Sequence, residues 1–573
     1  MAPSIASLGA IAQQSFKCAS VVPMSSGHRG PRRVASHQQQ GATAGIIASL
    51  DIHDQDMVHN KHMDNIVSLK KVILEENGRL EAMITIDSLK RLCIDYHFSE
   101  EIDVFLRSIY RDHRVFLKTK FCMFDAALTF TLPREGGYDI SPAKMIENLT
   151  LLCHAAEIFQ RFMNKNGEFD KSITTDMKGL LNLHDASHLN MGEDILHRAH
   201  NFTRKQLKSS LYYLEPNLAD LIREAIEHPY HITLQKYKVK HHLTYIQRMF
   251  GSNQAIEELA LREYYHSRML HQFELMQFTR WWRDQGIAQE LPFARNQAHK
   301  WYMWAMAILQ RGPAFSKYRL EMTKVISFIY VVDDIFDVAG SPVELSLFTD
   351  AVKRWDIAEA HSLPSYMRTC YTALHNVITD MAELVEKEYG QNPIYHFRKA
   401  WENLFDAFMV ETKWFAAQQL PTASDYLSNG VISSGVQVLL VHTFFLLGQG
   451  IGKDAVDLLQ HNSPIITSPA KILRLWDDLG SAKDEGQCGF DGSYKDCYMN
   501  ENPSCSSKAV ERHMMSLISE AWQELNKDCY SKRCFSPLFQ EVSMNLARMV
   551  RVMYTYDERQ NLPLLEEYTN SLL

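Results

Sequence analysis

Three aspartates stand at the end of a strongly apolar stretch, "VISFIYVVDDIFDVAG", at residues 325–340. The apolar residues before them predict a helix that is apolar on most faces, which is typical of a helix buried in a large core. Ionised carboxylates are costly in such an interior unless they are paired or bind a metal ion. On a helix, Asp333 and Asp337 share one face, about 6 Å apart along the axis. Two hard oxygen ligands at that spacing suit Mg²⁺. The alternative for this motif alone is an acidic helix end that meets solvent.

A second acidic pattern follows another apolar helix, in "RLWDDLGSAKDEGQ", which begins at Arg474. Asp477, Ser481 and Glu485 are spaced i, i+4 and i+8, so their oxygens fall on successive turns of one helical stripe. The alternative is a solvated helix face with Arg474 in a surface salt bridge. Because one chain holds both patterns, each after a buried helix, they favour two facing sites. Such sites could hold a cluster of Mg²⁺ ions and, through the ions, a diphosphate.

The elements that must position these residues are helical almost without pause from about residue 66 onward. Ser99 is a predicted N-cap, and the apolar residues from Ile102 to Ile109 recur at i, i+3, i+4 and i+7. Alternating β-branched runs are nearly absent, and no fixed-period repeat marks a helical solenoid. The predicted fold class is therefore all-α. A boundary between two helical domains is predicted near residues 255–275.

Length and composition bound the class of protein. A chain of 573 residues is too long for one compact core, so two or more domains are expected. The net charge of −8 gives no reason to expect nucleic acid as a partner. The 10 cysteines contain no CxxC pair, which favours a reducing compartment and argues against structural zinc. The longest apolar stretch, at 436–448, is too short to span a bilayer and predicts a core helix.

The first 50 residues have a composition of their own. They contain no Asp or Glu, and they carry Lys17, Arg29, Arg32 and Arg33 among many Ser, Ala and Gln. This composition predicts an organelle transit peptide, which we place at residues 1–55. A tail with no targeting function, on a cytoplasmic protein, is the alternative.

Four histidines lie close together in "HDASHLNMGEDILHRAH", namely His184, His188, His197 and His200. Their HxxxH spacing can bind zinc. No glutamate follows His184 to give the HExxH motif, so the sequence does not predict a zinc site here.

The two acidic motifs resemble those of the plant terpene synthase family, and the resemblance covers nearly all of the chain past the leader. Asp333–Asp337 is similar to the family's aspartate-rich motif, and "DDLGSAKDE" is similar to its second metal motif, (N/D)Dxx(S/T)xxxE. The resemblance implies a catalytically silent N-terminal helical domain at residues 56–265. It implies a C-terminal class I helical bundle, with the active site, at residues 266–573. No DxDD motif occurs in the first of these, so class II chemistry is not indicated.

The same resemblance implies a prenyl diphosphate substrate and three Mg²⁺ ions, with Mn²⁺ as an alternative ion. Arg295 and Arg474 would bind the departing diphosphate beside the metal ligands. Trp304 and Tyr554 would line the pocket of an allylic cation with their π faces, unless they are ordinary aromatic core residues. The helix break at 428–435, "SNGVISSG", would turn backbone carbonyls toward that cation. We expect a monomer with no membrane span.

Three segments, "LPFARNQAHKWYMWAMAIL", "ISFIYVVDDIFDVAG" and "RLWDDLGSAKDE", resemble the subfamily that makes the acyclic alcohols linalool and nerolidol. The tandem-arginine and tryptophan motif of cyclising members is missing, since the first tryptophan is Trp281, and their RxR motif reads Arg295-Asn296-Gln297. The expected reaction is ionisation of geranyl or farnesyl diphosphate followed by water capture, in the plastid. The alternatives are a cyclising mono- or sesquiterpene synthase, a chain-elongating prenyltransferase and a non-enzymatic helical organellar adaptor.

Overall fold

The structure is a computed structural model. It describes residues 61–75, 78–116, 122–138, 155–460, 463–481, 492–531, 534–557, 559 and 561–573. Within these ranges the chain forms helices and no strand, with one isolated bridge between Met163 and Phe169. The predicted all-α fold class is therefore confirmed. The predicted transit peptide lies outside the described residues.

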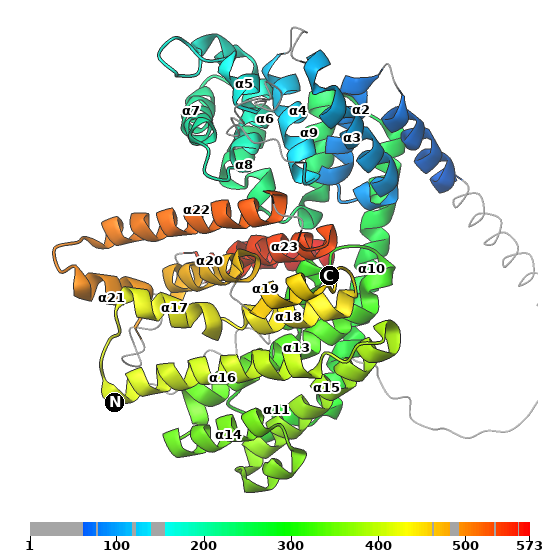
Figure 1. The fold of residues 1–573 in the computed structure, drawn as a ribbon. Coiled ribbons are helices and arrows are strands. Elements are labelled where there is room, and N and C mark those ends of the chain that lie inside the picture. Colours follow the sequence, from blue (N-terminus) through cyan, green and yellow to red (C-terminus); the bar gives the residue numbers. More distant parts are fainter. Residues whose placement is uncertain are drawn as a thin grey trace, which may run out of the picture. The chain divides into compact units, whose positions relative to one another are not determined.

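The first group of helices precedes residue 254. It consists of a helix at 61–74, α2 (Arg79–Arg91), η2 (Asp95–Phe98), α3 (Ser99–Phe116), α4 (Met123–Glu135), α5 (Ala155–Gln160), η3 (Lys171–Thr175), α6 (Met177–Ser187), α7 (Asp194–Ser210), α8 (Pro216–Glu227), η4 (Tyr230–Ile232), η5 (Lys236–Lys238) and α9 (Val239–Phe250). Figure 1 shows these helices in blue to green.

The second group begins with α10 and contains the longer helices. It consists of α10 (Gln254–Asp284), α11 (Ile287–Glu290), α12 (Ala298–Ile308), η6 (Pro313–Phe315), α13 (Ser316–Asp334), η7 (Ile335–Ala339), α14 (Pro342–Arg354), η8 (Ile357–Ser362), α15 (Ser365–Tyr389), α16 (Ile394–Ala417), α17 (Ala423–Ser433), α18 (Val436–Leu447), α19 (Lys453–Gln460), α20 (Pro464–Ser481), α21 (Tyr494–Glu501), α22 (Ser507–Ser531), α23 (Pro537–Tyr554) and α24 (Pro563–Leu572).

Helix α3 shows what the apolar periodicity could and could not predict. Its predicted buried face is correct, because Ile102, Phe105, Leu106 and Ile109 are all buried. The predicted N-cap at Ser99 is wrong. Ser99 is the first residue of α3 and continues directly from the 3₁₀ turn η2, and its hydroxyl donates a hydrogen bond back to the carbonyl of Tyr96 (3.1 Å).

Helix α10 runs through the predicted boundary at residues 265 and 266. It is 31 residues long and packs against α9 as well as against α12 and α13 (Figure 1). One continuous helix therefore belongs to both groups of helices, and residues 63–573 form one compact unit. The boundary within α10 stays a prediction.

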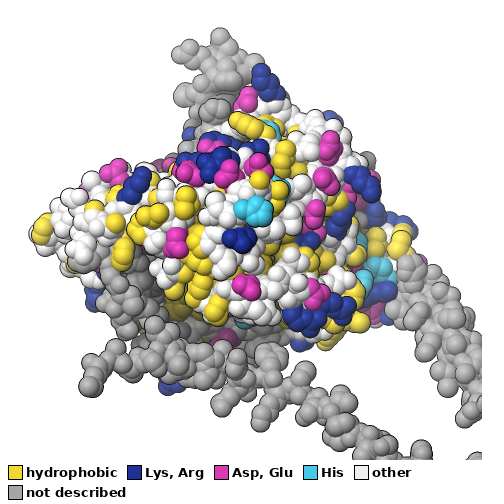
Figure 2. All heavy atoms as spheres, turned by 90° about the horizontal axis from the view of Figure 1, so that it is seen from below, with side chains coloured by type: hydrophobic (Ala, Val, Ile, Leu, Met, Phe, Trp, Pro, Cys, Tyr) yellow, Lys and Arg dark blue, Asp and Glu magenta, His cyan; other side chains and the backbone are white. Residues whose placement is uncertain are grey.

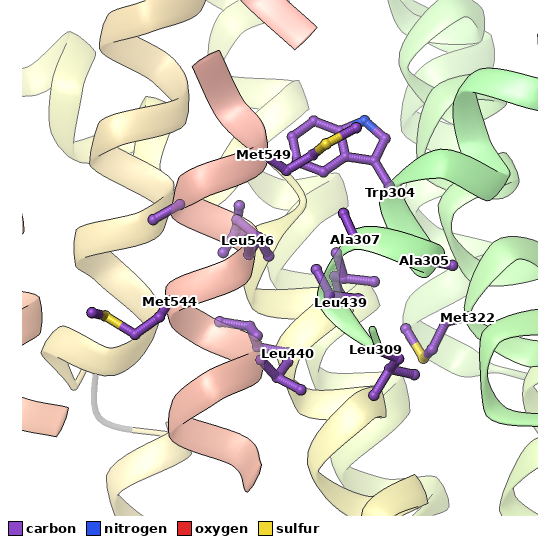
Figure 3. Packing of buried hydrophobic residues seen from close by; sticks show 14 of the residues in the cluster. Trp304, Ala305, Ala307, Leu309, Met322, Leu439, Leu440, Met544, Leu546 and Met549 are labelled. Carbon is purple, nitrogen blue, oxygen red and sulfur yellow. The ribbon is translucent and has the colours of Figure 1, made fainter. Parts of the chain in front are cut away.

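Apolar side chains from several helices of the second group pack together in its interior. Figure 3 shows Trp304 and Ala307 of α12 near Leu439 of α18 and near Leu546 and Met549 of α23. All five side chains are buried. The contacts of α12 with α13 and α23, and of α18 with α20, place these helices around one common interior.

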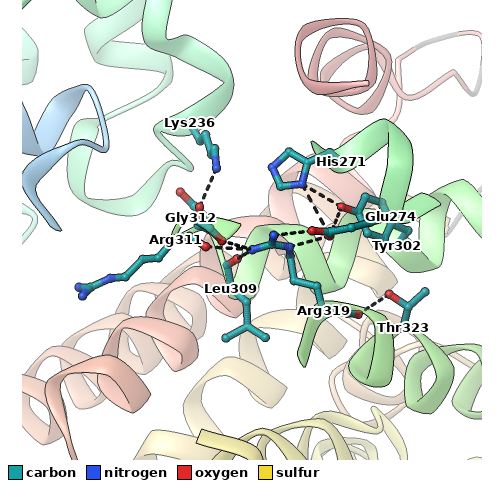
Figure 4. A network of polar contacts seen from close by, with 10 residues as sticks. Lys236, His271, Glu274, Tyr302, Leu309, Arg311, Gly312, Arg319 and Thr323 are labelled. Carbon is teal, nitrogen blue, oxygen red and sulfur yellow. Dashed lines mark hydrogen bonds and ion pairs between the residues drawn. The ribbon is translucent and has the colours of Figure 1, made fainter. Parts of the chain in front are cut away.

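A buried ion pair fixes α10 to α13. Nε and a terminal nitrogen of Arg319 donate to the two carboxylate oxygens of Glu274 (2.8 and 2.6 Å), and Tyr302 donates to the same carboxylate (2.6 Å). The other terminal nitrogen of Arg319 donates to the carbonyls of Leu309 and Arg311 (3.0 and 2.9 Å). Because each of these groups has a partner, the network in Figure 4 can hold charged groups in the core. Tyr302 belongs to α12, so the network also sets the position of α12 relative to α13.

The apolar stretch predicted as a core helix lies in the interior. Residues 423–447 are long and apolar enough to cross a membrane, yet 78% of their most apolar window is buried inside the protein, as in a core helix. On the face that Figure 2 shows, side chains of both charge signs are interspersed with hydrophobic ones.

Candidate active site

A cavity of about 440 Å³ opens among α12, α13, α16, α17, α18, α20 and α23. Its lining has two kinds of side chain. The charged side chains lie near one another, because Asp333, Arg295, Lys300 and Arg474 all act electrostatically on Asp477, and we call their part of the cavity the charged end. Apolar and aromatic groups such as Ile326, Leu439 and Leu546 line the rest. The cavity therefore combines a region of carboxylates and cations with an apolar region.

The aspartate-rich motif lies where α13 ends. The α-helix stops at Asp334 and continues as a single π-helical turn, η7. Asp333 and Asp337 both line the cavity, whereas the side chain of Asp334 is buried. The sequence predicted that Asp333 and Asp337 share a face of one α-helix. Instead, Asp333 lies in the last turn of α13 and Asp337 lies within the π turn, a feature that recurs at functional sites.

Arg295 lies against the motif from the loop before α12. Its guanidinium pairs with Asp333 and, through Nε, with Asp334 (2.7 Å). Its backbone N–H also donates to Asp334 (2.6 Å), and its guanidinium lies 4.9 Å from the ring centre of Tyr330. Asp334 therefore anchors Arg295, which stands at the charged end of the cavity.

Asp477 and Arg474 lie on α20 and line the same cavity. A terminal nitrogen of Arg474 is 3.6 Å from a carboxylate oxygen of Asp477. The other two predicted ligands of this motif remain predictions, because Glu485 and the side chain of Ser481 lie outside the described residues.

The charged groups that act on the pKa of Asp477 show that the two acidic motifs lie near each other. Burial raises the pKa of Asp477, the cations of Arg474, Lys300 and Arg295 oppose that shift, and the negative charge of Asp333 adds to it. Carboxylates from α13 and α20 therefore repel each other across the cavity. Carboxylate oxygens that face one space are the donors that Mg²⁺ prefers, so the residues present fit such an ion.

Arg474 is oriented by a short chain of hydrogen bonds. It donates to the hydroxyl of Ser433 (3.2 Å), which donates in turn to the carboxylate of Glu411 (2.6 Å). Within the described residues its Nε is buried and has no hydrogen-bond partner. A guanidinium that is held in place and lines a cavity is suited to bind an anion.

The two predicted aromatic residues face the same space. Trp304 and Tyr554 both line the cavity, with ring centres 6.5 Å apart and planes inclined by 52°. The indole of Trp304 donates to the hydroxyl of Tyr330 (3.0 Å), which fixes its orientation.

The predicted helix break separates α17 from α18. Ser433, Ser434 and Gly435 line the cavity at this break, and Gly435 has a left-handed backbone (φ 72°). A side chain at Gly435 would clash with Ile329, because its Cβ would lie 2.6 Å from Cγ2 of that residue. Close packing and positive φ both require glycine here.

The structure adds residues that the sequence analysis missed. Lys300 lines the cavity one turn before Trp304 on α12, a spacing that could have indicated a shared face. Glu411, in α16, also lines the cavity, and nothing in its sequence surroundings distinguishes it. Gln297, which replaces the second arginine of the RxR motif, is the N-cap residue of α12.

Comparison with known proteins identifies the two groups of helices. A model of the terpene synthase N-terminal domain matches residues 47–228, and a model of the metal-binding domain of the terpene synthase family matches residues 283–524. A probable terpene synthase of Ricinus communis is 41% identical over 503 residues, which is 87% of this chain and 85% of the relative.

Two further relatives have named products. An (E)-nerolidol synthase of Cannabis sativa is 42% identical over 90% of this chain and 92% of the relative. The chloroplastic S-(+)-linalool synthase of Arabidopsis thaliana is 37% identical over 92% of this chain and 90% of the relative.

Solved structures show the same fold. Isoprene synthase of grey poplar, in complex with three Mg²⁺ ions and dimethylallyl-S-thiolodiphosphate, has a TM-score of 0.82 at 31% identity and covers 90% of this chain and 97% of its own. A limonene synthase with 2-fluorolinalyl diphosphate has a TM-score of 0.83 at 30% identity and covers 90% of this chain and 94% of its own. The charged end of the cavity lies within the matched metal-binding domain, and the chain belongs to the plant terpene synthase family.

Proposed function

We propose that this terpene synthase ionises geranyl diphosphate, and also farnesyl diphosphate, with Mg²⁺ and captures the cation with water. The products would be the acyclic tertiary alcohols linalool and nerolidol. The observation that carries the proposal is the polarity of the cavity, with carboxylates and cations at one end and apolar and aromatic side chains elsewhere. A prenyl diphosphate has the same two parts.

The charged end would bind the diphosphate. Arg295, Lys300 and Arg474 line it and would supply positive charge and hydrogen-bond donors to the phosphate oxygens. Asp333, Asp337 and Asp477 would hold three Mg²⁺ ions, or Mn²⁺, together with Ser481 and Glu485. When bound, these ions supply positive charge that neutralises the diphosphate as it leaves.

The reaction that we propose adds one water molecule. The bond between C1 and the diphosphate oxygen breaks, and its electron pair leaves with the diphosphate. The π faces of Trp304 and Tyr554 then flank the allylic cation. A water oxygen forms a bond to the tertiary carbon C3, and a proton of that water passes to the released diphosphate.

Two features support an acyclic product over a cyclic one. Cyclisation of a ten-carbon chain requires the diphosphate to stay close while it returns to C3, the bond rotates and a second ionisation follows. The first feature is Gln297, a neutral amide where cyclising relatives have an arginine. The second is the missing tandem-arginine and tryptophan motif, since the first tryptophan of the chain is Trp281. Fewer contacts to the diphosphate and a less complete cover would admit water early. The names of the nerolidol and linalool synthase relatives also support this product class.

We further propose that the protein is a monomer imported into the plastid, with a transit peptide at residues 1–55, an N-terminal domain at 56–265 and a catalytic domain at 266–573. The acid-free leader and the chloroplastic name of the Arabidopsis relative support import. A fluorescent fusion of residues 1–60 is expected in plastids. A cytosolic signal would contradict import and would favour nerolidol as the product in the cell.

The enzyme assay is direct. Purified protein is incubated with Mg²⁺ and each prenyl diphosphate, and the products are separated by chiral gas chromatography. We expect linalool from the ten-carbon substrate, nerolidol from the fifteen-carbon substrate and no turnover with a chelator in place of Mg²⁺. Mostly limonene or another cyclic product would contradict the product class. No turnover of either substrate would contradict the proposal as a whole.

A further inference from the structure

Three imidazoles from two helices meet in the N-terminal group of helices, far from the proposed reaction in sequence. His184 lies in α6, His188 follows α6 directly, and His200 lies in α7. Their ring centres are 5.0 Å (184 to 188), 4.9 Å (188 to 200) and 5.6 Å (184 to 200) apart. Each offers one ring nitrogen, and these nitrogens all lie within 4.8 Å of one another. Ligand nitrogens of a tetrahedral zinc ion lie about 3.3 Å apart, so small ring movements would bring the three into range.

Hydrogen bonds fix which nitrogen of His184 is free. The hydroxyl of Thr203 donates its one hydrogen to the carbonyl of Ala199 (2.8 Å), so its oxygen accepts from Nδ1 of His184 (3.1 Å). Nδ1 therefore carries the proton, and Nε2 presents a lone pair. A hydrogen bond of this kind also holds the rings of metal-binding histidines in place.

The same argument applies to His200. The hydroxyl of Ser187 donates to the carbonyl of His184 (2.6 Å), so it accepts from Nδ1 of His200 (3.4 Å) and leaves the Nε2 lone pair of His200 available. Within the described residues, Nε2 of His184 and Nε2 of His188 are buried and have no hydrogen-bond partner. Buried polar atoms without partners are rare and call for a ligand or another compensating group.

Burial favours the neutral form of all three rings. Burial lowers the pKa of His184 to about 3, with His200 and Arg204 adding to the shift. Burial likewise lowers the pKa of His188 and of His200. Neutral imidazole is the form that binds metal ions, so no bound proton competes with the metal.

We propose that His184, His188 and His200 form a site for a transition-metal ion, Zn²⁺ by preference, with solvent as the fourth ligand. Nitrogen donors select such ions over Mg²⁺, so this site is independent of the proposed diphosphate chemistry. The absence of HExxH argued against zinc in the sequence analysis, but His200 joins from the next helix and needs no such motif. The ion would tie α6 to α7 beside a loop in which the carbonyls of His188 and Asn190 accept from Asn526 of α22 (2.9 Å each). Its role is therefore to stabilise the helices that contact α22.

The test uses the full chain without a histidine tag, treated with a chelator, dialysed, and then titrated with Co²⁺ in excess Mg²⁺. Excess Mg²⁺ occupies the carboxylate sites, and tetrahedral Co²⁺ reports nitrogen ligands by its visible absorption. We expect one Co²⁺ per chain, displaced by Zn²⁺, and a higher Tm with Zn²⁺. His200→Gln should raise the Kd for Co²⁺ more than about tenfold, since even the loss of a hydrogen-bond partner of a metal ligand lowers affinity 10- to 100-fold. His197→Gln, on the same helix but exposed, is the matched control and should change nothing.

A second variant guards against loss of folding. His200→Cys keeps a metal ligand and should bind Co²⁺ with an added thiolate charge-transfer band. The proposal is overturned if the wild-type chain shows no tetrahedral Co²⁺ spectrum, if His200→Gln and His197→Gln bind equally well, or if His200→Cys lacks the thiolate band. The three rings would then be a packed aromatic cluster without an ion.

Discussion

At the scale of single residues, the carboxylates of the cavity are balanced by the protein's own cations. Asp333 pairs with Arg295, and Asp477 lies beside Arg474. Metal binding at Asp333, a proposed ligand, would therefore compete with Arg295, and a diphosphate would give that guanidinium a new anionic partner. In the proposed reaction, substrate binding would exchange one set of ion pairs for another.

Replacing Asp333 or Asp337 with alanine is expected to lower turnover at least about 100-fold, because each change removes a proposed metal ligand at the charged end. The fold should stay intact, since losing Asp333 relieves repulsion on Asp477. Steady-state rates and circular dichroism check both points. Val338→Ala, an exposed neighbour on the same π turn, is the control and should keep its activity. Near-normal turnover in both aspartate variants would contradict the proposal that Asp333 and Asp337 bind metal ions.

Lys300→Met tests the cation that the sequence analysis missed. Lys300 lines the cavity within electrostatic range of Arg295 and Asp477. Loss of its charge should raise the KM for geranyl diphosphate about tenfold, the size expected for one hydrogen bond to a charged group. Lys324→Met is the control, because that lysine pairs with Glu321 on α13. Equal KM values for the two variants would rule out a role for Lys300 in binding.

At the scale of elements, the break between α17 and α18 shapes the cavity. Gly435→Ala is expected to destabilise the protein by about 1–2 kcal/mol, because alanine is strained at φ 72° and its Cβ would clash with Ile329. It should also lower kcat, since Ser433 orients Arg474 next to the break. Thermal unfolding and steady-state kinetics measure both effects.

The matched control is Gly452→Ala, where an added Cβ meets nothing within 4 Å. That change should stay within about 0.5 kcal/mol of wild type. If the two glycine variants have the same stability and kcat, the break does not require glycine.

The buried pair between Glu274 and Arg319 makes stability depend on pH. Burial alone would raise the pKa of Glu274, but hydrogen bonds from Arg319, His271 and Tyr302 lower it to about 2. Because the folded pKa lies below the unfolded value of about 4.3, the carboxylate stabilises the fold above that pH, and the contribution is lost as pH falls toward 2.

Glu274→Gln should therefore reduce the free energy of unfolding at neutral pH by about 3–5 kcal/mol, since it leaves Arg319 buried and unpaired. The variant should also lose this part of the acid dependence, which denaturant unfolding at several pH values would measure. Lys317→Met, which breaks a more exposed pair with Glu388, should cost less than about 1 kcal/mol. Equal losses in the two variants would contradict a structural role for the buried network.

Local patterns predicted the elements well, and contacts between distant elements account for what they missed. Apolar periodicity gave the buried face of α3, and the "SSG" signal gave the break before α18. The π turn at Ile335–Ala339 was not predicted, because its sequence reads as ordinary helix. Glu411 was missed, because it depends on helices that only the fold brings together. The histidines at 184–200 were noted, but no zinc site was predicted, because the meeting of His184, His188 and His200 also depends on the fold.

At the scale of the whole molecule, the N-terminal helices contact the helices of the second group at several points. His231 bonds to the amide oxygen of Asn526 on α22 (2.8 Å), and Lys236 donates to the carbonyl of Gln310 (2.6 Å), next to the network of Arg319. α10 contributes to both groups of helices. The cavity itself is lined by the second group, so the proposed reaction would take place among α12–α23.

In the proposed reaction, a prenyl diphosphate is ionised in this cavity and the resulting cation is captured by water. Mass spectrometry of the product formed from geranyl diphosphate and Mg²⁺ in ¹⁸O-labelled water tests this proposal most directly. We expect linalool as the main product, with the label in its tertiary hydroxyl, because the carbon–oxygen bond of the substrate breaks and the new oxygen comes from water. A mainly cyclic product, or linalool without the label, would contradict it.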